Sequence, residues 1–348
     1  MKKIIIKNKK IGEKSPSFII AEAGVNHNGN IKLAKKLIDK AKEAGVDAIK
    51  FQTFKTEDIV TKQASQAKYQ AKNIGKKESQ YEMLKRLELS EKDFIELKKY
   101  CDGKKIIFLS TPHTEQAIDF LDALVPAYKV GSGDLTNLPF LEKMARKNKP
   151  IILSTGMAIL AEIKEAVKVI KNQNNNKIII LHCTTNYPCP LEEVNLRAME
   201  TIKKEFNLLT GYSDHTKGIN VSLVAVGLGA CLIEKHFTLD KNLPGPDHKA
   251  SLEPAELKKL VEEIRNIEKA MGNGIKKPNK SEEEIKKVAR KSVVAKVNIK
   301  KGEKITKEML IIKRPGTGIE PKHLNKLINR KVKKNIKQDS LIKFQDII

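Results

Sequence analysis

The sequence predicts a (β/α)8 barrel followed by a small β-rich module. Eight short runs of aliphatic and β-branched residues alternate with segments of helical periodicity, which is typical of parallel βαβ units. The chain has 348 residues, enough for a barrel of roughly 250 residues and one smaller domain. We therefore expect a barrel domain over residues 1–271, a linker over 272–289 and a second domain over 290–348.

The predicted strands are short apolar runs. An N-terminal hairpin is expected first, because Lys9-Lys10-Ile11-Gly12 separates the run 4–6 from the run that begins at 17. The eight barrel strands are predicted at residues 18–21, 48–51, 106–109, 127–130, 151–153, 178–181, 208–211 and 232–234. Eight strands close such a barrel, whereas a doubly wound sheet favours a GxGxxG turn after its first strand, and none follows here.

Helical periodicity fills the segments between these runs. One such series is Ala34, Leu37, Ile38, Ala41 and Ala44. Pro254 suits the first position of the last barrel helix, where a missing N–H is harmless. Residues 52–90 are polar and too many for an ordinary βα loop, so we interpret them as a cover over the active site. Gly and Pro residues between 272 and 278 mark the linker.

The net charge of +25 admits a second class of protein. Such a balance is also typical of nucleic-acid-binding proteins. Here the excess is mainly Lys along the whole chain, without an RRM, KH or zinc-finger pattern. A lysine-rich solvated surface is the favoured interpretation, and a basic nucleic-acid-binding protein is the alternative.

The chain start and the cysteines indicate a cytoplasmic protein. No apolar run approaches the roughly 18 residues that span a bilayer, and residues 1–7 lack the apolar stretch of a signal peptide, so we expect no membrane partner. The four cysteines form no CxxC pair and are expected to be reduced and buried.

Polar residues follow each of the eight predicted strands. In a parallel barrel these carboxyl ends meet at one face, where active sites lie, so the sequence predicts a central active site. The residues at the strand ends include Glu22; Lys50 and Gln52; Ser110 and Thr111; Lys129 and Asp134; Ser154; His182 and Tyr187; Ser213 and His215; and Glu234 and His236.

Lys50 and Lys129 lie on predicted strands. Burial of a Lys is costly unless a carboxylate or an anionic ligand compensates it, so internal ion pairs with Glu22 or Asp134 are the alternative to a ligand. Glycine-flanked hydroxyl residues at 131–133 and 154–156 offer N–H and O–H donors to phosphate oxygens. Together these features predict a phosphate or carboxylate site.

His215 and His236 are 21 positions apart, one βα unit, at the ends of neighbouring predicted strands. Neighbouring strands are about 5 Å apart, so two such imidazoles can share one divalent ion and leave positions open for water and substrate. The alternative is a pair of hydrogen-bonded core histidines.

Eight sequence motifs span the predicted barrel: residues 18–29 (FIIAEAGVNHNG), 50–53 (KFQT), 129–134 (KVGSGD), 154–157 (STGM), 182–188 (HCTTNYP), 211–216 (GYSDHT), 234–240 (EKHFTLD) and 245–251 (GPDHKAS). These motifs resemble the N-acetylneuraminate synthase family, and residues 290–295 (RKSVVA) and 313–316 (KRPG) resemble its C-terminal antifreeze-like (SAF) domain.

The resemblance implies an enzyme of defined activity. It implies condensation of phosphoenolpyruvate, N-acetylmannosamine and water to N-acetylneuraminate and phosphate, by a domain-swapped homodimer. It also implies a divalent metal, Mn²⁺ first, with Mg²⁺ or Co²⁺ as alternatives.

The resemblance also implies roles for individual residues. His215 and His236 would bind the metal and, with Glu22 and Glu234, form the catalytic set; which carboxylate orients the water or takes a proton is left open. Phosphoenolpyruvate would bind Lys50, Asn73, Thr111, Lys129, Ser132, Ser154, Asn186 and Ser213. The sugar would contact Glu22, Tyr187, Asp247 and Arg314.

Alternatives of the same mechanism are legionaminic acid synthase and other nonulosonic acid synthases. Residues 245–251 look unlike the pseudaminic acid branch. An ice- or carbohydrate-binding protein led by the C-terminal module is an alternative from another class.

Overall fold

The computed structural model describes residues 2–75 and 78–348. The chain divides into two compact units, Met1–Gly272 and Asn273–Ile348, and each is described by itself.

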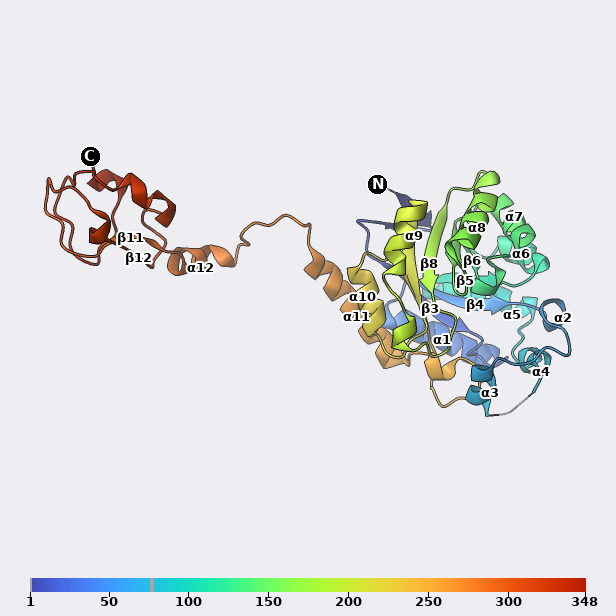
Figure 1. The fold of residues 1–348 in the computed structure, drawn as a ribbon. Helices are drawn as coiled ribbons and strands as arrows, with labels where there is room; N and C mark the ends of the chain where they lie inside the picture. Colours follow the sequence, from blue (N-terminus) through green and yellow to red (C-terminus); the bar gives the residue numbers. More distant parts are fainter. Residues whose placement is uncertain (1, 76–77) are drawn as a thin grey trace. The chain divides into compact units, whose positions relative to one another are not determined.

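The first unit is built around an eight-stranded parallel sheet in the order β5-β4-β3-β10-β9-β8-β7-β6. Figure 1 shows this sheet with helices around it. The first and last barrel strands pair, with Phe18 opposite Leu232, so the sheet curls into a nearly closed barrel. Each predicted run lies within or overlaps one strand, which confirms the predicted fold class. The strands are β3 (Phe18–Gly24), β4 (Ala48–Thr53), β5 (Ile107–Pro112), β6 (Tyr128–Val130), β7 (Ile151–Ser154), β8 (Ile178–Cys183), β9 (Leu209–Asp214) and β10 (Leu232–His236).

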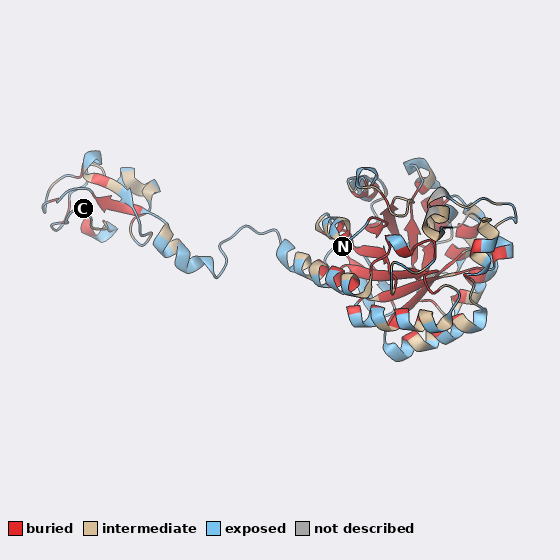
Figure 2. Cartoon of the chain, turned by 90° about the horizontal axis from the view of Figure 1, so that it is seen from below, coloured by how far each residue is buried: buried red, intermediate tan, exposed pale blue. Residues whose placement is uncertain are grey.

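Helices surround this sheet and bury their apolar faces against it (Figure 2). Helix α1 begins where the Asn30 side chain accepts hydrogen bonds from the backbone N–H groups of Lys32 and Leu33, and Pro254 is the first residue of α11, as predicted. The helices are α1 (Ile31–Ala44), α5 (Glu91–Lys104), α6 (Glu115–Asp122), α7 (Leu138–Arg146), α8 (Leu160–Asn172), α9 (Ala198–Phe206), α10 (Asn220–Gly227) and α11 (Pro254–Met271).

The predicted N-terminal hairpin closes one end of the barrel. Strands β1 (Lys3–Ile6) and β2 (Lys9–Gly12) pair antiparallel, and their Ile6 and Ile11 are buried in the same cluster as Phe18 and Leu232. The amino ends of the barrel strands are therefore covered by apolar side chains, which leaves the carboxyl ends as the open face.

The long segment between β4 and α5 forms three short helices: α2 (Thr56–Ile59), α3 (Lys68–Ile74) and α4 (Gln80–Lys85). A small apolar cluster of Val25, Phe54, Met83 and Leu87 joins this segment to the loop after β3. The described part of the segment expected as a polar cover thus has a small apolar core of its own.

The second unit contains α12 (Glu282–Ala289) and two antiparallel strands, β11 (Ser292–Ala295) and β12 (Leu310–Lys313). The 3-10 helix η4 (Lys307–Met309) lies between these two strands, and η5 (Pro321–Lys326) and η6 (Phe344–Asp346) follow them. Its core includes Val293, Ile305 and Leu327. Helix α12 lies within residues 272–289, the predicted linker.

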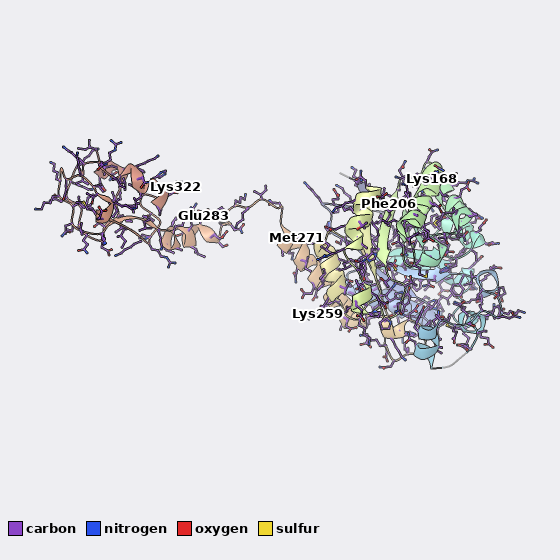
Figure 3. All side chains as sticks on the ribbon, viewed as in Figure 1. Lys168, Phe206, Lys259, Met271, Glu283 and Lys322 are labelled. Atoms are coloured by element: carbon purple, nitrogen blue, oxygen red, sulfur yellow. The ribbon has the colours of Figure 1, made fainter. Side chains whose placement is uncertain are left out.

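Lysines lie mostly at the surface of both units, and Lys168, Lys259 and Lys322, which are labelled in Figure 3, are exposed examples. This placement agrees with a solvated basic surface. Within residues 2–75 and 78–348, no helix is both long and apolar enough to cross a membrane. All four cysteines are buried free thiols.

Candidate active site

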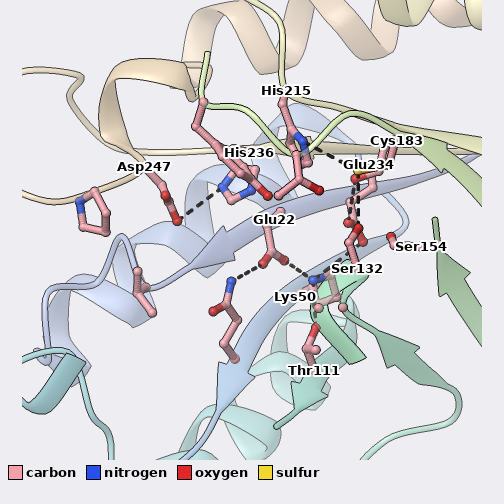
Figure 4. Close-up of a pocket in the computed structure, with 18 of the residues that line it drawn as sticks. Glu22, Lys50, Thr111, Ser132, Ser154, Cys183, His215, Glu234, His236 and Asp247 are labelled. Atoms are coloured by element: carbon pink, nitrogen blue, oxygen red, sulfur yellow. Dashed lines mark hydrogen bonds and ion pairs between the residues drawn. The ribbon is translucent and has the colours of Figure 1, made fainter. Parts of the chain in front are cut away.

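A cavity of about 230 Å³ opens at the carboxyl ends of the barrel strands. Figure 4 shows side chains from opposite strands converging on it. The predicted site residues that line it are Glu22, Lys50, Thr111, Lys129, Ser132, Ser154, Tyr187, Ser213, His215, Glu234, His236 and Asp247.

Lys50 occupies the middle of a buried charge network. Its Nζ lies 2.7 Å from Glu22 Oε2 and 3.6 Å from Glu234 Oε2, and it donates a 3.0 Å hydrogen bond to Thr111 Oγ1. The predicted ion pair with Glu22 is therefore present. Because Lys50 also lines the cavity, the ion pair and an anionic ligand are compatible interpretations of this residue.

Lys129 forms the second buried cation of the site. Its Nζ donates to Ser154 Oγ at 2.5 Å and lies 3.5 Å from Glu234 Oε1, which also accepts a hydrogen bond from Ser213. Asp134, the carboxylate proposed as its ion-pair partner, instead lies 3.4 Å from His113 Nδ1. The carboxylate that pairs with Lys129 is therefore Glu234 of β10, four strands away from β6 in the sheet order.

The two carboxyl groups differ in their pKa. Burial and the charge of Glu234 raise the pKa of Glu22 in spite of Lys50. Burial also raises the pKa of Glu234, but Lys129 and Lys50 lower it more, so its net shift is downward. For Lys50, burial lowers the pKa and the two glutamates raise it more. The network therefore keeps at least one cation and one anion at the cavity.

A hydroxyl cradle lies where β6, β7 and β8 end. Ser132 Oγ accepts a 3.1 Å hydrogen bond from the backbone N–H of Gly156. A Cβ on Gly156 would lie 2.1 Å from Thr185 Oγ1, so only glycine permits this close approach. Thr185 lines the cavity, and its buried Oγ1 has no hydrogen-bond partner among the described residues. Thr185 was not predicted as a site residue.

Three predicted residues are not among the described residues that line this cavity. Asn186 Nδ2 lies 3.5 Å from Glu193 Oε2, and Asn73 Nδ2 donates a 2.7 Å hydrogen bond to the carbonyl oxygen of Pro246. Asn73 therefore fastens α3 to a residue of the cavity wall. Arg314 belongs to the second unit, where Nε donates to the carbonyl oxygen of Ala289.

The two predicted metal ligands lie side by side. The ring centroids of His215 and His236 are 5.4 Å apart, and the Tyr187 ring lies 4.1 Å from that of His215. His215 Nδ1 is 2.7 Å from the carbonyl oxygen of Thr184. Since a carbonyl can only accept, Nδ1 carries the hydrogen, and the other nitrogen of a neutral ring keeps its lone pair.

The environment of His236 favours its neutral imidazole form. Its pKa is far below the usual value, first because of burial and then because the Lys50 ammonium and, when protonated, the His215 ring disfavour a second positive charge nearby. Its buried Nδ1 has no hydrogen-bond partner in the described part of the chain, and Asp247 Oδ2 lies 3.9 Å away. Burial and Glu22 raise the pKa of Asp247 to about 6.

These observations fit a divalent ion held by two imidazoles. In residues 2–75 and 78–348, no group of three or more His, Cys, Asp or Glu is arranged to hold a metal. A two-histidine site leaves coordination positions for water and substrate oxygen, as a catalytic metal requires, and is unsuited to a closed structural metal.

Cys183 also lines the cavity and was not predicted as a site residue. Its Sγ lies 3.7 Å from Ser132 Oγ and 3.7 Å from His215 Nδ1, between the hydroxyl cradle and the histidines. Leu181 belongs to the barrel-interior cluster, and side chains two apart share a face of a strand. The alternation along β8 was therefore a signal for Cys183.

The barrel and its buried lysine–carboxylate site define a member of a known synthase family. The model of the NeuB family matches residues 37–276, and that of the SAF domain matches residues 290–348. The chain belongs to the NeuB family and carries a C-terminal SAF domain, which confirms the family resemblance.

Named relatives cover nearly the whole chain. The chain is 52% identical to the N,N'-diacetyllegionaminic acid synthase of Campylobacter jejuni, covering 94% of this chain and 99% of the relative. It is 39% identical to human N-acetylneuraminate-9-phosphate synthase, with coverages of 95% and 93%. The crystal structure of N-acetylneuraminic acid synthetase from Leptospira borgpetersenii in complex with citrate is 38% identical, with a TM-score of 0.73 and coverages of 82% and 95%.

Proposed function

We propose that this protein is a nonulosonic acid synthase that condenses phosphoenolpyruvate with a diacetamido hexose to give N,N'-diacetyllegionaminic acid and phosphate. The observation that carries this choice is the 52% identity to a legionaminic acid synthase, against 39% to the human N-acetylneuraminate-9-phosphate synthase. N-Acetylneuraminate synthase, the function first expected from the sequence, is the second candidate. A nucleic-acid-binding protein does not account for the buried charges at the strand ends.

The charge network supports the proposed phosphoenolpyruvate site. Lys50 and Lys129 supply buried cations, and Thr111, Ser132 and Ser154 supply hydroxyl groups around the same cavity. Charge-assisted hydrogen bonds of this kind are stronger than neutral ones, so an anion with phosphate and carboxylate groups suits the cavity. Thr185 replaces Asn186 in our proposal, because its hydroxyl group is the one that lines the cavity.

The sugar is proposed to lie toward Asp247 and Tyr187. Asp247 is close to His236, and the Tyr187 ring packs against both histidines. Glu22 lies opposite His236 in the strand register, and its charge helps to raise the pKa of Asp247. A sugar aldehyde bound here would lie next to the enol carbon of a phosphoenolpyruvate bound by the lysines.

The reaction joins the enol carbon of phosphoenolpyruvate to the aldehyde carbon, and the C=C and C=O π bonds open as this bond forms. The water oxygen bonds to the neighbouring carbon, whose bond to the phosphate oxygen then breaks as the keto group forms. Lys50 and Lys129 would hold the anion, and Glu22 or Glu234 would orient the water and pass one of its protons to the alkoxide, while the other proton leaves with the phosphate. A divalent ion bound by His215 and His236, Mn²⁺ first, would supply electrostatic stabilisation of the developing alkoxide.

We further propose a cytoplasmic, domain-swapped homodimer in which Arg314 serves the site of the partner chain. Arg314 is exposed, and its turn connects to β11 through the hydrogen bond from Ser292 Oγ to the carbonyl oxygen of Pro315. The ten residues before α12 extend up to about 35 Å, and the eight residues of α12 add about 12 Å, a reach that permits exchange of the second domain between two chains. The planar guanidinium offers several fixed donors to sugar oxygens.

A panel of amino sugars tests the proposed specificity. With phosphoenolpyruvate and Mn²⁺, we expect kcat/KM for 2,4-diacetamido-2,4,6-trideoxymannose to exceed that for N-acetylmannosamine at least tenfold. The reverse order would establish the second candidate, N-acetylneuraminate synthase.

A further inference from the structure

A buried ion pair lies directly behind the two site histidines. Asp214 Oδ2 and Lys235 Nζ are 2.9 Å apart, and both side chains are 0% exposed. The two residues are paired in register on β9 and β10. Neither is among the described residues that line the cavity, so the proposed reaction gives them no contact with substrate.

The position of the pair follows from strand geometry. Asp214 immediately precedes His215, and Lys235 immediately precedes His236. Since successive side chains of a strand point to opposite faces, the histidines face the cavity and the ion pair faces the surrounding helices. The 2.6 Å hydrogen bond from Ser222 Oγ of α10 to Asp214 Oδ2 agrees with this orientation.

The pair also fixes the chain on both sides of His215. Asp214 Oδ1 accepts 2.8 Å hydrogen bonds from the backbone N–H and the hydroxyl group of Thr216. Lys235 Nζ donates a 2.5 Å hydrogen bond to the carbonyl oxygen of Thr216. His215 therefore lies between two residues whose positions are tied to β10, the strand that carries His236.

Stability alone does not explain such a pair, because a buried ion pair is often no more stabilising than packed apolar residues of the same size. What it adds is a defined geometry. We propose that Asp214 and Lys235 are positioning residues that hold His215 and His236 at the separation with which they jointly bind a divalent cation. This inference rests on the metal site of the proposed function. Groups behind metal ligands commonly change metal affinity by 10- to 100-fold.

The test compares Mn²⁺ binding to the full-length protein and to Asp214→Asn/Lys235→Met. The double variant removes both charges together, and its amide and thioether keep the approximate shapes of the original side chains. Electron paramagnetic resonance measures free Mn²⁺ during the titration. Calorimetry measures phosphoenolpyruvate binding in the absence of metal, and circular dichroism measures folding. Leu141→Ala, which opens a cavity under α7, is the control for general destabilisation.

We expect the Kd for Mn²⁺ to rise roughly 10- to 100-fold in the double variant. Metal-free phosphoenolpyruvate binding should stay within twofold, and Leu141→Ala should lower the melting temperature without changing the Kd for Mn²⁺. A folded double variant with a Kd within twofold of wild type overturns the inference. Should the double variant not fold, Ser222→Ala removes one hydrogen bond from Asp214, and an unchanged Kd there overturns it equally. A wild-type protein that binds no Mn²⁺ overturns the metal site itself.

Discussion

Lys129 Nζ lies 3.5 Å from Glu234 Oε1, and both side chains are almost completely buried. Each charge reduces the cost of burying the other. Each also contacts a hydroxyl group at the end of a neighbouring strand, Ser154 for the lysine and Ser213 for the glutamate. The arrangement links the proposed anion site to a carboxylate that faces the same cavity.

Lys129→Met should weaken phosphoenolpyruvate binding and leave sugar binding almost unchanged. Loss of a charge-assisted hydrogen bond costs about 2 kcal/mol, so KM for phosphoenolpyruvate should rise roughly 30-fold. Steady-state kinetics with each substrate varied separately measure this, and Lys168→Met, on the exposed side of α8, is the control. An unchanged KM would reduce Lys129 to a structural partner of Glu234.

Substitution of the two glutamates should separate their roles. Glu234 contacts Lys129 and Ser213, two groups of the proposed phosphoenolpyruvate site, so Glu234→Gln should mainly raise KM for phosphoenolpyruvate. Glu22 lies toward the sugar side, so Glu22→Gln should lower kcat by a factor on the order of 10² or more, the usual loss for a general base. Rapid-quench measurement of the chemical step checks the assignment, and the opposite pattern would give the proton transfer to Glu234.

Thr185 and Asn186 offer a direct comparison of adjacent residues. Thr185→Val keeps the shape and removes the hydroxyl group, so KM for phosphoenolpyruvate should rise roughly tenfold. Asn186→Ala should change it less than twofold, because the Asn186 side chain is directed to Glu193. A large effect at Asn186 with none at Thr185 would restore the assignment made from the sequence.

Mixed dimers test whether Arg314 acts in the partner's site. We expect Arg314→Ala and His236→Ala to lose more than 90% of activity as separate proteins, in keeping with the loss of a substrate contact and of a metal ligand. In a mixed dimer, one of the two sites holds both intact groups, so activity should return. If subunit exchange is verified and the mixture stays inactive, Arg314 does not serve the partner.

The barrel strands were predictable because each one is a short buried run bounded by helical periodicity. Runs such as 178–181 are apolar on both faces of the sheet, as parallel strands between helices and a barrel core must be. The side chains at their carboxyl ends were predictable for the same reason, since the alternation along each strand continues to the residues that line the cavity.

The loop after β8 was less predictable. The strand is followed by Thr184, Thr185 and Asn186, which belong to no helix or strand. Their side chains therefore do not alternate in direction as in a strand, and the sequence alone did not indicate which of them faces the cavity. The choice depends on the approach of Gly156 to Thr185, a contact between residues far apart in sequence.

The charge pattern of residues 282–289 indicates a helix, which the interpretation of these residues as part of a linker did not include. Its first turn is acidic, and Glu283 and Glu284 lie three positions before Lys286 and Lys287, with which they form ion pairs. Such pairs and the helix dipole favour a helix in a segment with no buried face. The short helix α4 carried a comparable signal, the capping box of Ser79.

The most direct test of the central claim follows carbon from ¹³C₃-labelled phosphoenolpyruvate into product. The purified protein, Mn²⁺ and 2,4-diacetamido-2,4,6-trideoxymannose should yield a nine-carbon acid with three labelled carbons and one equivalent of phosphate, measured by mass spectrometry and phosphate assay. Chelation should stop the reaction, and added Mn²⁺ should restore it. Phosphate release that does not depend on a sugar, or no labelled nine-carbon acid from any amino sugar supplied, would contradict the claim.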